Sequence, residues 1–490
     1  MRPDPRRADQ RRGGWPEIVR HRMDFANWLP RSVAAHREWT GRWPDFAAHP
    51  ACAVDEERLG DAFAELAGRL RDTYPFFHPR YVGQMLKPPH PVAALGYLTA
   101  MLANPNNHAL DGGPATAALE REVIEQLAAM FGLPIPFGHL TSSGTLGNLQ
   151  ALYVARESHP SAGVAFSADA HYTHARMCHV LNIPAYPVAV DERGRLDLAA
   201  LEQTLRTGRV GTVVVTVGTT ALGAVDPVHE ILPLARRHGV RVHVDAAYGG
   251  FHKTIAESDA SILDPAPWRA IGDCDSVVVD PHKHGLQPYG CGAVLYRDAE
   301  VGRFFLHDSP YTYFTSGELH PGELSLECSR SGAAAAALWL TLRVFPLTPD
   351  GLGAVLTPGR QAALRWAAEL RHDPVLRLYQ EPDLDIVTYY PAQPRTLTAL
   401  DAASAALMTA GMTDTDPVYV ALLRVRANDF ALRDTGVTPD RPDARILRSV
   451  LMKPESLSAT PELLFRLREL ARKYSSGPDS RIGSVKAPRR

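Results

Sequence analysis

VRVHVDAAYGG, residues 240–250, is the stretch that decides the fold of this chain. Its β-branched first half predicts a short buried strand, which ends in Asp245 and a series of small residues. DSVVVDPHKHG at 275–285 has the same form, with Lys283 beyond the apolar run. Both stretches therefore place a charged side chain shortly after a buried strand.

The neighbouring segments alternate between strand and helix patterns. TVVVTVG at 212–218 and GAVLYRD at 292–298 predict further strands, and HEILPLARRHG at 229–239 predicts a helix that ends at Gly239. Continuous apolar strands that alternate with helices are typical of an α/β fold, in which helices cover both faces of a mostly parallel sheet. We predict that architecture for residues 137–350.

The rest of the chain divides around this sheet. An apolar face at helical spacing between residues 59 and 70 predicts a helical segment before it. DIVTYYP at 385–391 and VYVALLRV at 418–425 alternate like strands, and Thr460 is expected to cap a last helix with Pro461 at its first position. The predicted division is a disordered arm at 1–14, an N-terminal helical segment at 15–136, a large domain at 137–350, a small α+β domain at 351–474 and a disordered tail at 475–490.

Composition and charge narrow the classes of function. The 490 residues carry a formal net charge of −2, with 45% apolar and 22% charged residues, which indicates neither a nucleic-acid nor a membrane partner. The longest apolar run, 333–342, is too short to span a bilayer. The five cysteines are widely spaced and form no CxxC pair, so we expect a reducing cytoplasm and no cysteine zinc site.

Polar groups gather where such a fold binds its ligands. In open α/β sheets the ligand lies at the carboxyl ends of the strands. Asp245, the pair His282 and Lys283, and Thr219 follow three predicted strands. A lysine in a partly desolvated cleft loses some stabilisation of its charge, which favours the neutral, nucleophilic amine. For the isolated residue, a surface lysine after a strand is the alternative.

HLTSSGTLGNLQAL at 139–152 adds a candidate anion site. Ser143, Gly144 and Thr145 lie at the start of a predicted helix, where free backbone N–H groups and the helix dipole attract a phosphate. Taken alone, this pattern is more often an ordinary helix cap.

Four motifs in order resemble the pyridoxal phosphate (PLP)-dependent decarboxylases of fold type I. This group II family includes aromatic amino acid, tyrosine, glutamate and cysteine sulfinate decarboxylases. The resemblance covers about residues 75–342 and, more faintly, the C-terminal domain. It implies a PLP-dependent transferase-like fold and the decarboxylation of an L-amino acid to the amine and CO₂. The motifs are TSSGTLGNLQAL at 141–152, DAHYTHARMC at 169–178, HVDAAYGG at 243–250 and DPHKHG at 280–285.

The resemblance also implies roles for single residues. Lys283 would hold pyridoxal 5'-phosphate as a Schiff base, Asp245 would pair with the pyridine nitrogen, and Ala247 would leave room for the ring. His171 would stack on the opposite ring face and help to place the substrate carboxylate. The remaining cofactor contacts would be Ser143, Gly144 and Thr145 at the phosphate, His282 nearby, and Thr219.

Two of these assignments have alternatives. Thr219 fits nearly as well as a buried threonine that satisfies the backbone at a strand end. His171, His174, Cys178 and His179 are close in sequence, but their spacing fits one helical face only partly, so we expect no metal.

The family often returns the proton to Cα through a tyrosine on a mobile loop. FFLHDSPYTYFTSGELHPGE at 304–323 is the candidate loop, and within it we prefer Tyr311 to Tyr313. A loop tyrosine without a catalytic part is the alternative. Family members are typically homodimers whose loops cross into the partner's site, so we expect a homodimer with its active site at the interface.

The sequence leaves the amino acid substrate open. NPNNHALDGG at 104–113 stands where the resemblance implies an aromatic-rich segment in enzymes that act on aromatic substrates, which argues against an aromatic substrate and leaves an acidic or polar amino acid open. Residues 106–108 would face the substrate or form turns. Arg424 and Arg426 would bind a carboxylate or lie exposed on a strand.

Two other functions remain possible from the motifs alone. An aldehyde synthase, a carbon–carbon lyase or an aminotransferase would keep the same lysine and aspartate. A catalytically silent PLP-binding homologue is the second alternative, although the intact set of Lys283, Asp245 and His171 argues against it.

Overall fold

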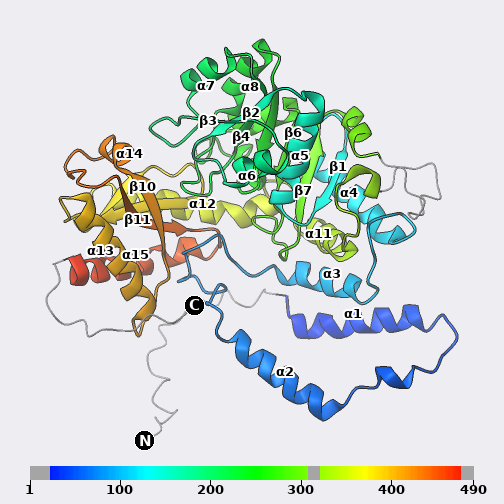
Figure 1. Cartoon of the computed structure of the whole chain (residues 1–490). Coiled ribbons are helices and arrows are strands. Elements are labelled where there is room, and N and C mark those ends of the chain that lie inside the picture. Colours follow the sequence, from blue (N-terminus) through cyan, green and yellow to red (C-terminus); the bar gives the residue numbers. More distant parts are fainter. Residues whose placement is uncertain (1–22, 307–320, 476–490) are drawn as a thin grey trace, which may run out of the picture.

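The central sheet forms from the apolar runs that alternate with helices. In this computed structural model, which describes residues 23–306 and 321–475, seven strands pair in the order β1-β7-β6-β5-β4-β2-β3 (Figure 1). β7 runs antiparallel to β1 and β6, and the other neighbours are parallel, so the predicted mostly parallel sheet is confirmed. The strands are β1 Phe137–Thr141, β2 Gly163–Ser167, β3 Ala185–Val188, β4 Val210–Thr216, β5 Arg241–Asp245, β6 Ser276–Val279 and β7 Gly292–Tyr296.

Helices pack on both sides of this sheet (Figure 1). Each turns an apolar stripe inward, as α4 does with Val123, Ile124, Leu127 and Phe131, which are at most 3% exposed. The predicted helix at 229–239 corresponds to α8. The helices of this region are α4 Pro114–Phe131, α5 Gly144–Ser158, α6 Thr173–Val180, α7 Leu198–Leu205, α8 Val228–Arg237, α9 Lys253–Ala256, α10 Ala266–Arg269 and α11 Gly332–Val344.

Three α-helices precede α4 in the described residues, and they are not equally covered. α3 (Pro91–Met101) packs against α11, where a Cβ at Gly96 would lie 2.9 Å from the Ala337 Cα, so only glycine allows this close approach. α1 (Phe25–Thr40) packs on α3, whereas α2 (Glu56–Leu70) stands away from the body of the chain (Figure 1). The predicted apolar face of α2 exists, but the described residues leave it exposed.

The second, smaller sheet is antiparallel, in the order β10-β11-β9-β8. The predicted strands at 385–391 and 418–425 correspond to β9 and β10. The predicted domain boundary near residue 350 stays a prediction; the two sheets lie on either side of it. The elements are α12 Leu352–Leu370, β8 Leu376–Gln380, β9 Ile386–Pro391, α13 Leu397–Thr413, β10 Ala421–Arg426, α14 Ala427–Ala431, β11 Asp443–Val450 and α15 Ser456–Ser475.

The last helix begins earlier than the sequence pattern predicted. α15 starts at Ser456, so Thr460 and Pro461 lie inside it, and the prediction that Thr460 caps the helix was wrong. The Thr460 hydroxyl donates to the Ser456 carbonyl at 2.8 Å. Pro461 removes one backbone hydrogen bond, but the buried leucines of α15 pack in a hydrophobic cluster with residues of α12, β9 and β11, and that packing outweighs the loss.

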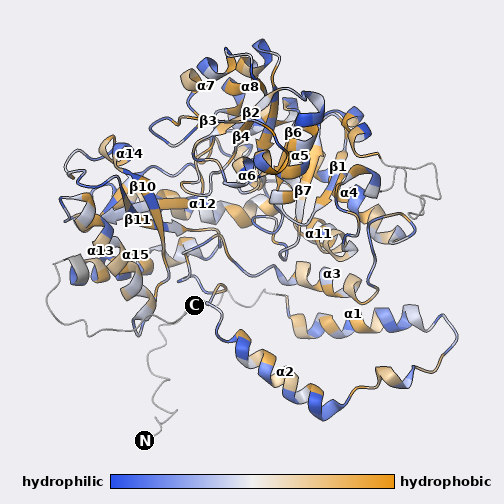
Figure 2. Cartoon of the chain, viewed as in Figure 1, coloured by the Kyte–Doolittle hydropathy of each residue, from blue (hydrophilic) through white to orange (hydrophobic). Residues whose placement is uncertain are grey.

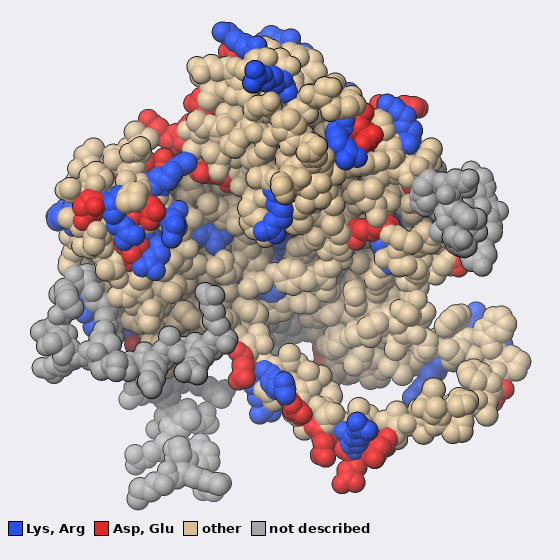
Figure 3. All heavy atoms as spheres, viewed as in Figure 1, with Lys and Arg blue, Asp and Glu red and all other residues tan. Residues whose placement is uncertain are grey.

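Hydrophobic and charged residues are distributed differently between the central sheet and the surface. Figure 2 shows hydrophobic residues along the central strands and both kinds of residue on α2. On the face drawn in Figure 3, lysines and arginines lie among aspartates and glutamates over the region of the four-stranded sheet and over α2. None of the helices in the described ranges is long and apolar enough to cross a membrane. The predicted arm at 1–14, the predicted tail beyond Ser475, and Tyr311 fall outside the described residues.

Candidate active site

A cavity of about 230 Å³ lies at the carboxyl ends of β1, β2, β4, β5 and β6. Because these five strands run in the same direction, the residues that follow them meet at one edge of the sheet. The predicted site residues that line the cavity are Ser143, Gly144, Thr145, His171, Asp245, Ala247, His282 and Lys283.

Asp245 ends β5 and lies buried at one side of this cavity. Its Oδ2 is 2.8 Å from His174 Nε2 and accepts a hydrogen bond from Asn148 Nδ2 at 3.2 Å, while its Oδ1 accepts the Ala247 amide at 3.1 Å. Burial alone would raise the pKa of Asp245, but the hydrogen bond from His174 and the nearby positive charges hold that pKa well below its usual range. The carboxyl group therefore stays ionised.

The sequence motifs did not predict that Asn148 and His174 support Asp245. Asn148 lies one turn after Gly144 on α5, and its Oδ1 is 2.8 Å from His243 Nε2, which fixes the orientation of the amide. His174 is fully buried on α6. For Asn148, the sequence did contain a signal: it is a polar residue in the first turns of a helix that directly follows a strand.

Lys283 follows β6 in a short turn. Its Nζ lies 3.0 Å from Asp280 Oδ2, and its side chain keeps 23% of its surface exposed. Asp280 was not among the predicted residues. His282 is the residue before Lys283, and burial lowers its pKa. The Nδ1 atom of His282 is 2.8 Å from the Cys291 carbonyl oxygen. The neutral imidazole therefore donates to this carbonyl, which holds the ring beside the cavity.

The chain after Lys283 takes an unusual backbone conformation. Leu286 has a φ of 67°, in the left-handed region that leucine avoids. Its carbonyl accepts the His90 amide at 2.9 Å, and its side chain is 6% exposed. Packing and this hydrogen bond therefore keep the turn that carries the lysine in a strained form.

The N-terminus of α5 forms another side of the cavity. Ser143 caps the helix, because its hydroxyl accepts the Leu146 amide at 3.4 Å. A Cβ at Gly144 would lie 2.6 Å from Asp280 Oδ2, so this position requires glycine. Thr145 comes next, with its hydroxyl 3.4 Å from that of Thr173. The first-turn N–H groups and the dipole of this helix suit an anion.

His171 borders the cavity from the segment between β2 and α6. Its Nδ1 is 2.7 Å from the Thr173 hydroxyl, and burial, aided by the charge of Lys283, lowers its pKa. The ring is therefore mostly neutral near pH 7. Ala247, 9% exposed, lines the same cavity with a small side chain.

Other candidates lie elsewhere. Thr219 is fully buried and its hydroxyl accepts the Ala224 amide at 3.0 Å; Gly218 and Thr220 line the cavity in its place. The segment around His171 forms no metal cluster within the described residues, because His174 bonds to Asp245, Cys178 packs in an apolar cluster and His179 is exposed.

The polar segment at 104–113 uses its asparagines internally. Asn107 is fully buried and bonds to Thr116 and Glu120, and the Asn106 side chain accepts the amides of His108 and Arg330. These residues form turns, which was the alternative the sequence left open.

The two strand arginines line a different cavity, of about 430 Å³. Arg426 pairs with Asp429 and Asp169, and Arg424 lies 3.9 Å from Asp443 and is largely exposed. Within the described residues they do not reach the cavity of Lys283.

The residues of the Lys283 cavity fit PLP. The cofactor has an aldehyde that reacts with an amine, a pyridine nitrogen that binds a carboxylate, and a phosphate. Lys283, ionised Asp245 and the N-terminus of α5 have the chemistry that would suit these three parts in turn.

Comparison with known proteins decides the family. Residues 77–390 match the family model described as the pyridoxal-dependent decarboxylase conserved domain. The chain belongs to the pyridoxal-dependent decarboxylase family. It is an amino acid carboxy-lyase that uses PLP, and the alternative fold type I reactions are not favoured.

Relatives of this decarboxylase carry two kinds of name. An L-tyrosine decarboxylase of Enterococcus faecium is 27% identical, over 69% of this chain and 71% of the relative. An L-aspartate decarboxylase of Thermococcus kodakarensis is also 27% identical, over 69% and 85%. A probable L-tyrosine/L-aspartate decarboxylase of Methanothrix thermoacetophila is 31% identical, over 60% and 72%.

Solved structures confirm the fold. Mouse CSAD superposes with a TM-score of 0.73 at 20% identity, over 94% of this chain and 99% of that one. Tryptophan decarboxylase of Catharanthus roseus gives a TM-score of 0.72 at 16% identity, over 94% and 100%. The decarboxylase therefore has the fold type I architecture that the motifs predicted.

Proposed function

We propose that Lys283 and Asp245 are the two main cofactor-binding groups of this decarboxylase. The observation that carries the proposal is their meeting, with the N-terminus of α5, in one cavity at the carboxyl edge of the sheet. The Lys283 amine would form the covalent link once it leaves its ion pair with Asp280. When bound, PLP supplies a ring that accepts the electron pair of the broken C–COO⁻ bond. Asp245 would keep the ring nitrogen protonated for that purpose.

The other predicted residues would orient the cofactor and the substrate. Ser143, Gly144 and Thr145 would bind the phosphate with the help of His282. His171, which is mostly neutral and lines the same cavity as Ala247, would stack on the ring and place the substrate carboxylate. We keep Thr219 as a support of the turn that lines the cavity, and Tyr311 as the donor of the proton that returns to Cα.

We infer that the substrate is L-tyrosine or L-aspartate, because relatives with both names match most of their own length. The polar segment at 104–113 does not exclude an aromatic substrate, since its asparagines are used in internal hydrogen bonds.

A panel of amino acids tests this substrate assignment. Purified protein with added PLP is expected to release CO₂ and the matching amine from tyrosine or aspartate, with a kcat/KM at least about tenfold above that for glutamate, tryptophan and cysteine sulfinate. CO₂ trapping and amine chromatography measure both products. An aldehyde or a keto acid in place of the amine would contradict the assignment.

We propose that the decarboxylase is a homodimer with its active site at the interface. Support comes from α2, whose Leu59, Phe63, Leu66 and Leu70 share one face and are 49–66% exposed. An isolated helix of 15 residues with a bare apolar face is marginally stable in water. A second copy of the chain that covers this face would explain why the sequence keeps it apolar.

Leu66→Glu is expected to weaken dimerisation by about tenfold or more, because it places a charge in an apolar interface. Light scattering over a range of protein concentrations measures the mass. Gly68→Glu is the matched control: it lies on the opposite side of α2, where an added Cβ meets nothing within 4 Å. Equal masses for both variants and the wild type would contradict the role of α2 in the interface.

We also infer a cytoplasmic location. The inference is supported by the five cysteines, all of which are free thiols, with Cys52 and Cys328 exposed.

A further inference from the structure

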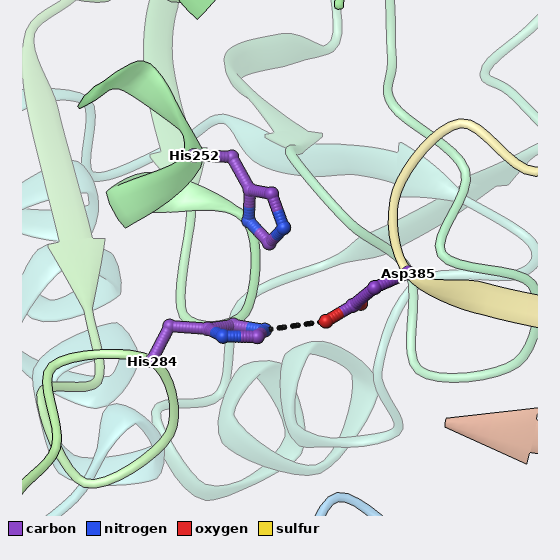
Figure 4. A group of neighbouring side chains, drawn as sticks. All are labelled: His252, His284 and Asp385. Carbon is purple, nitrogen blue, oxygen red and sulfur yellow. Dashed lines mark ion pairs between the residues drawn. The ribbon is translucent and has the colours of Figure 1, made fainter. Parts of the chain in front are cut away.

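A second polar cluster lies behind the wall of the cofactor cavity. Figure 4 shows His252 and His284 turned toward Asp385, which directly precedes β9 of the small domain. Tyr248 joins them from the turn after β5. All four side chains are at most 3% exposed, so the cluster is shielded from water.

Asp385 connects the two segments that carry the main cofactor-binding groups. Its Oδ1 accepts a hydrogen bond from the Tyr248 hydroxyl at 2.6 Å, and Tyr248 is three residues beyond Asp245 and lines the cavity. Its Oδ2 lies 3.3 Å from Nε2 of His284, the residue next to Lys283. We call Asp385, Tyr248 and His284 the Asp385 bridge.

The rings of the cluster support one another. His284 meets Tyr248 edge to face, with ring centroids 4.7 Å apart, and meets His252 in the same way at 4.6 Å. Because these contacts pack the His284 ring closely, the ring has little freedom to move. A shift of Asp385 or Tyr248 would therefore also shift His284, which is one residue from Lys283.

Asp385 carries the negative charge of this cluster. Burial lowers the pKa of His252 to about 4 and holds the pKa of His284 well below its ordinary value, so both rings are neutral at pH 7. Burial and Asp385 raise the pKa of Tyr248 well above 10, so its hydroxyl keeps its proton. The cations that interact with Asp385 are Lys87 before α3, Arg360 on α12 and Arg448 on β11.

A metal centre is the competing explanation. His252, His284 and Asp385 offer ligand atoms that all lie within 4.8 Å of one another, the one such group in the described ranges. No ring nitrogen of these histidines has a hydrogen-bond partner within the described part of the chain. However, a dication would add two charges near the cations Lys87, Arg360 and Arg448, and repulsion from these groups disfavours it.

We propose that Asp385 is a positioning residue, which fixes from the small domain the spacing between the Asp245 segment and the Lys283 turn. The proposal rests on the cofactor roles assigned to Asp245 and Lys283. In this arrangement the Asp385 carboxylate holds Tyr248 by a hydrogen bond and His284 by a close polar contact. These two contacts of Asp385 would thereby set the position of the lysine.

Asp385→Asn in the full-length, PLP-loaded enzyme tests this role, because it keeps the shape and an acceptor for Tyr248 but removes the charge. We expect kcat to fall by about tenfold or more while KM changes little, since a small misplacement of the reacting groups is costly. We also expect the pH midpoint of the lysine-bound cofactor's visible absorption to move down by about half a unit or more, because a nearby anion that stabilises the protonated form is lost.

Asp401→Asn is the matched control. Asp401 is also a mostly buried small-domain carboxylate, and it pairs with Arg445 at 2.6 Å, away from the cavity of Lys283. We expect this variant to lower the melting temperature of the apoprotein as Asp385→Asn does, but to leave the pH midpoint and kcat unchanged. Should Asp385→Asn not fold, Tyr248→Phe keeps the ring, loses the hydrogen bond to Asp385 and is expected to lower kcat by about threefold or more.

Three results would overturn the proposal. If Asp385→Asn, or Tyr248→Phe in its place, matches Asp401→Asn in pH midpoint and kcat, the bridge is only structural. If elemental analysis finds one divalent metal per chain that Asp385→Asn loses, the cluster is a metal centre. A wild-type enzyme without a cofactor band or CO₂ release would instead contradict the proposed roles of Lys283 and Asp245.

Discussion

Lys283→Ala is expected to abolish the covalent attachment of PLP and to lower kcat by about 10⁴-fold or more. Lys283 is the lysine that lines the cavity, and alanine offers no amine to form the link with the cofactor. The absorption spectrum, the mass of the borohydride-reduced protein and the rate of CO₂ release measure the loss. We expect the fold to survive with some loss of stability, because the Lys283 side chain is 23% exposed, but its removal leaves the buried Asp280 without its ion-pair partner.

Lys253→Ala is the control for this prediction. Lys253 lies on α9, is mostly buried and pairs with Glu257 at 2.8 Å, but it does not line the cavity. We expect this variant to lose some stability and to keep its cofactor adduct. A reduced adduct that persists in Lys283→Ala would show that another lysine forms the link.

Asp245→Asn is expected to lower kcat by about a hundredfold or more, because preorganised buried charges contribute that much to catalysis. The amide has nearly the same shape but cannot hold the ring nitrogen in its protonated form. It also places an N–H₂ group where His174 and Asn148 now meet a carboxylate. Steady-state kinetics and the spectrum of the bound cofactor measure the effect; binding of PLP should weaken less than kcat falls.

Asp275→Asn is the matched change at the other end of the same strands. Asp275 precedes β6, accepts the Val242 amide at 2.7 Å and lies 3.5 Å from Arg241, so we expect its substitution to lower stability and to leave kcat unchanged. Similar kcat values for the two variants would count against a charge–charge role of Asp245.

The centre of the fold could be predicted because its signals are local. A β-branched run that ends in a polar residue predicts both a buried strand and the edge at which that residue lies. Asp245 therefore lies at the end of β5, and Lys283 lies in the turn four residues after the end of β6, as the motifs predicted. Ser143 was predicted for the same reason, since a helix N-terminus is visible in a few residues.

What could not be predicted depends on contacts between distant segments. His174 reaches Asp245 from 71 residues away, and Asp385 reaches Tyr248 from 137 residues away. No local pattern specifies such a pair. The position of Pro461 inside α15 has the same origin, because core packing rather than helix propensity decided where the helix begins.

Periodicity shows that a helix has an apolar face, but not what covers it. The pattern between residues 59 and 70 predicted α2 correctly, yet its leucines are exposed. Polarity shows in the same way that a side chain needs hydrogen-bond partners, but not which ones. The asparagines at 106 and 107 could have faced the substrate, but they bond to backbone and side-chain groups of the chain itself.

The backbone at Leu286 ties the cavity that carries Lys283 to the segment before α3, which does not line that cavity within the described residues. A left-handed leucine costs about 1–2 kcal/mol, so the turn keeps this form only while its surroundings impose it. The amide of His90 is one of those surroundings, in the segment that leads into α3. None of α1, α2 or α3 lines the cavity. In a truncated enzyme that lacked them and the segment before α3, we expect the backbone at Leu286 to leave its left-handed conformation, which would displace Lys283 from its position in the cavity.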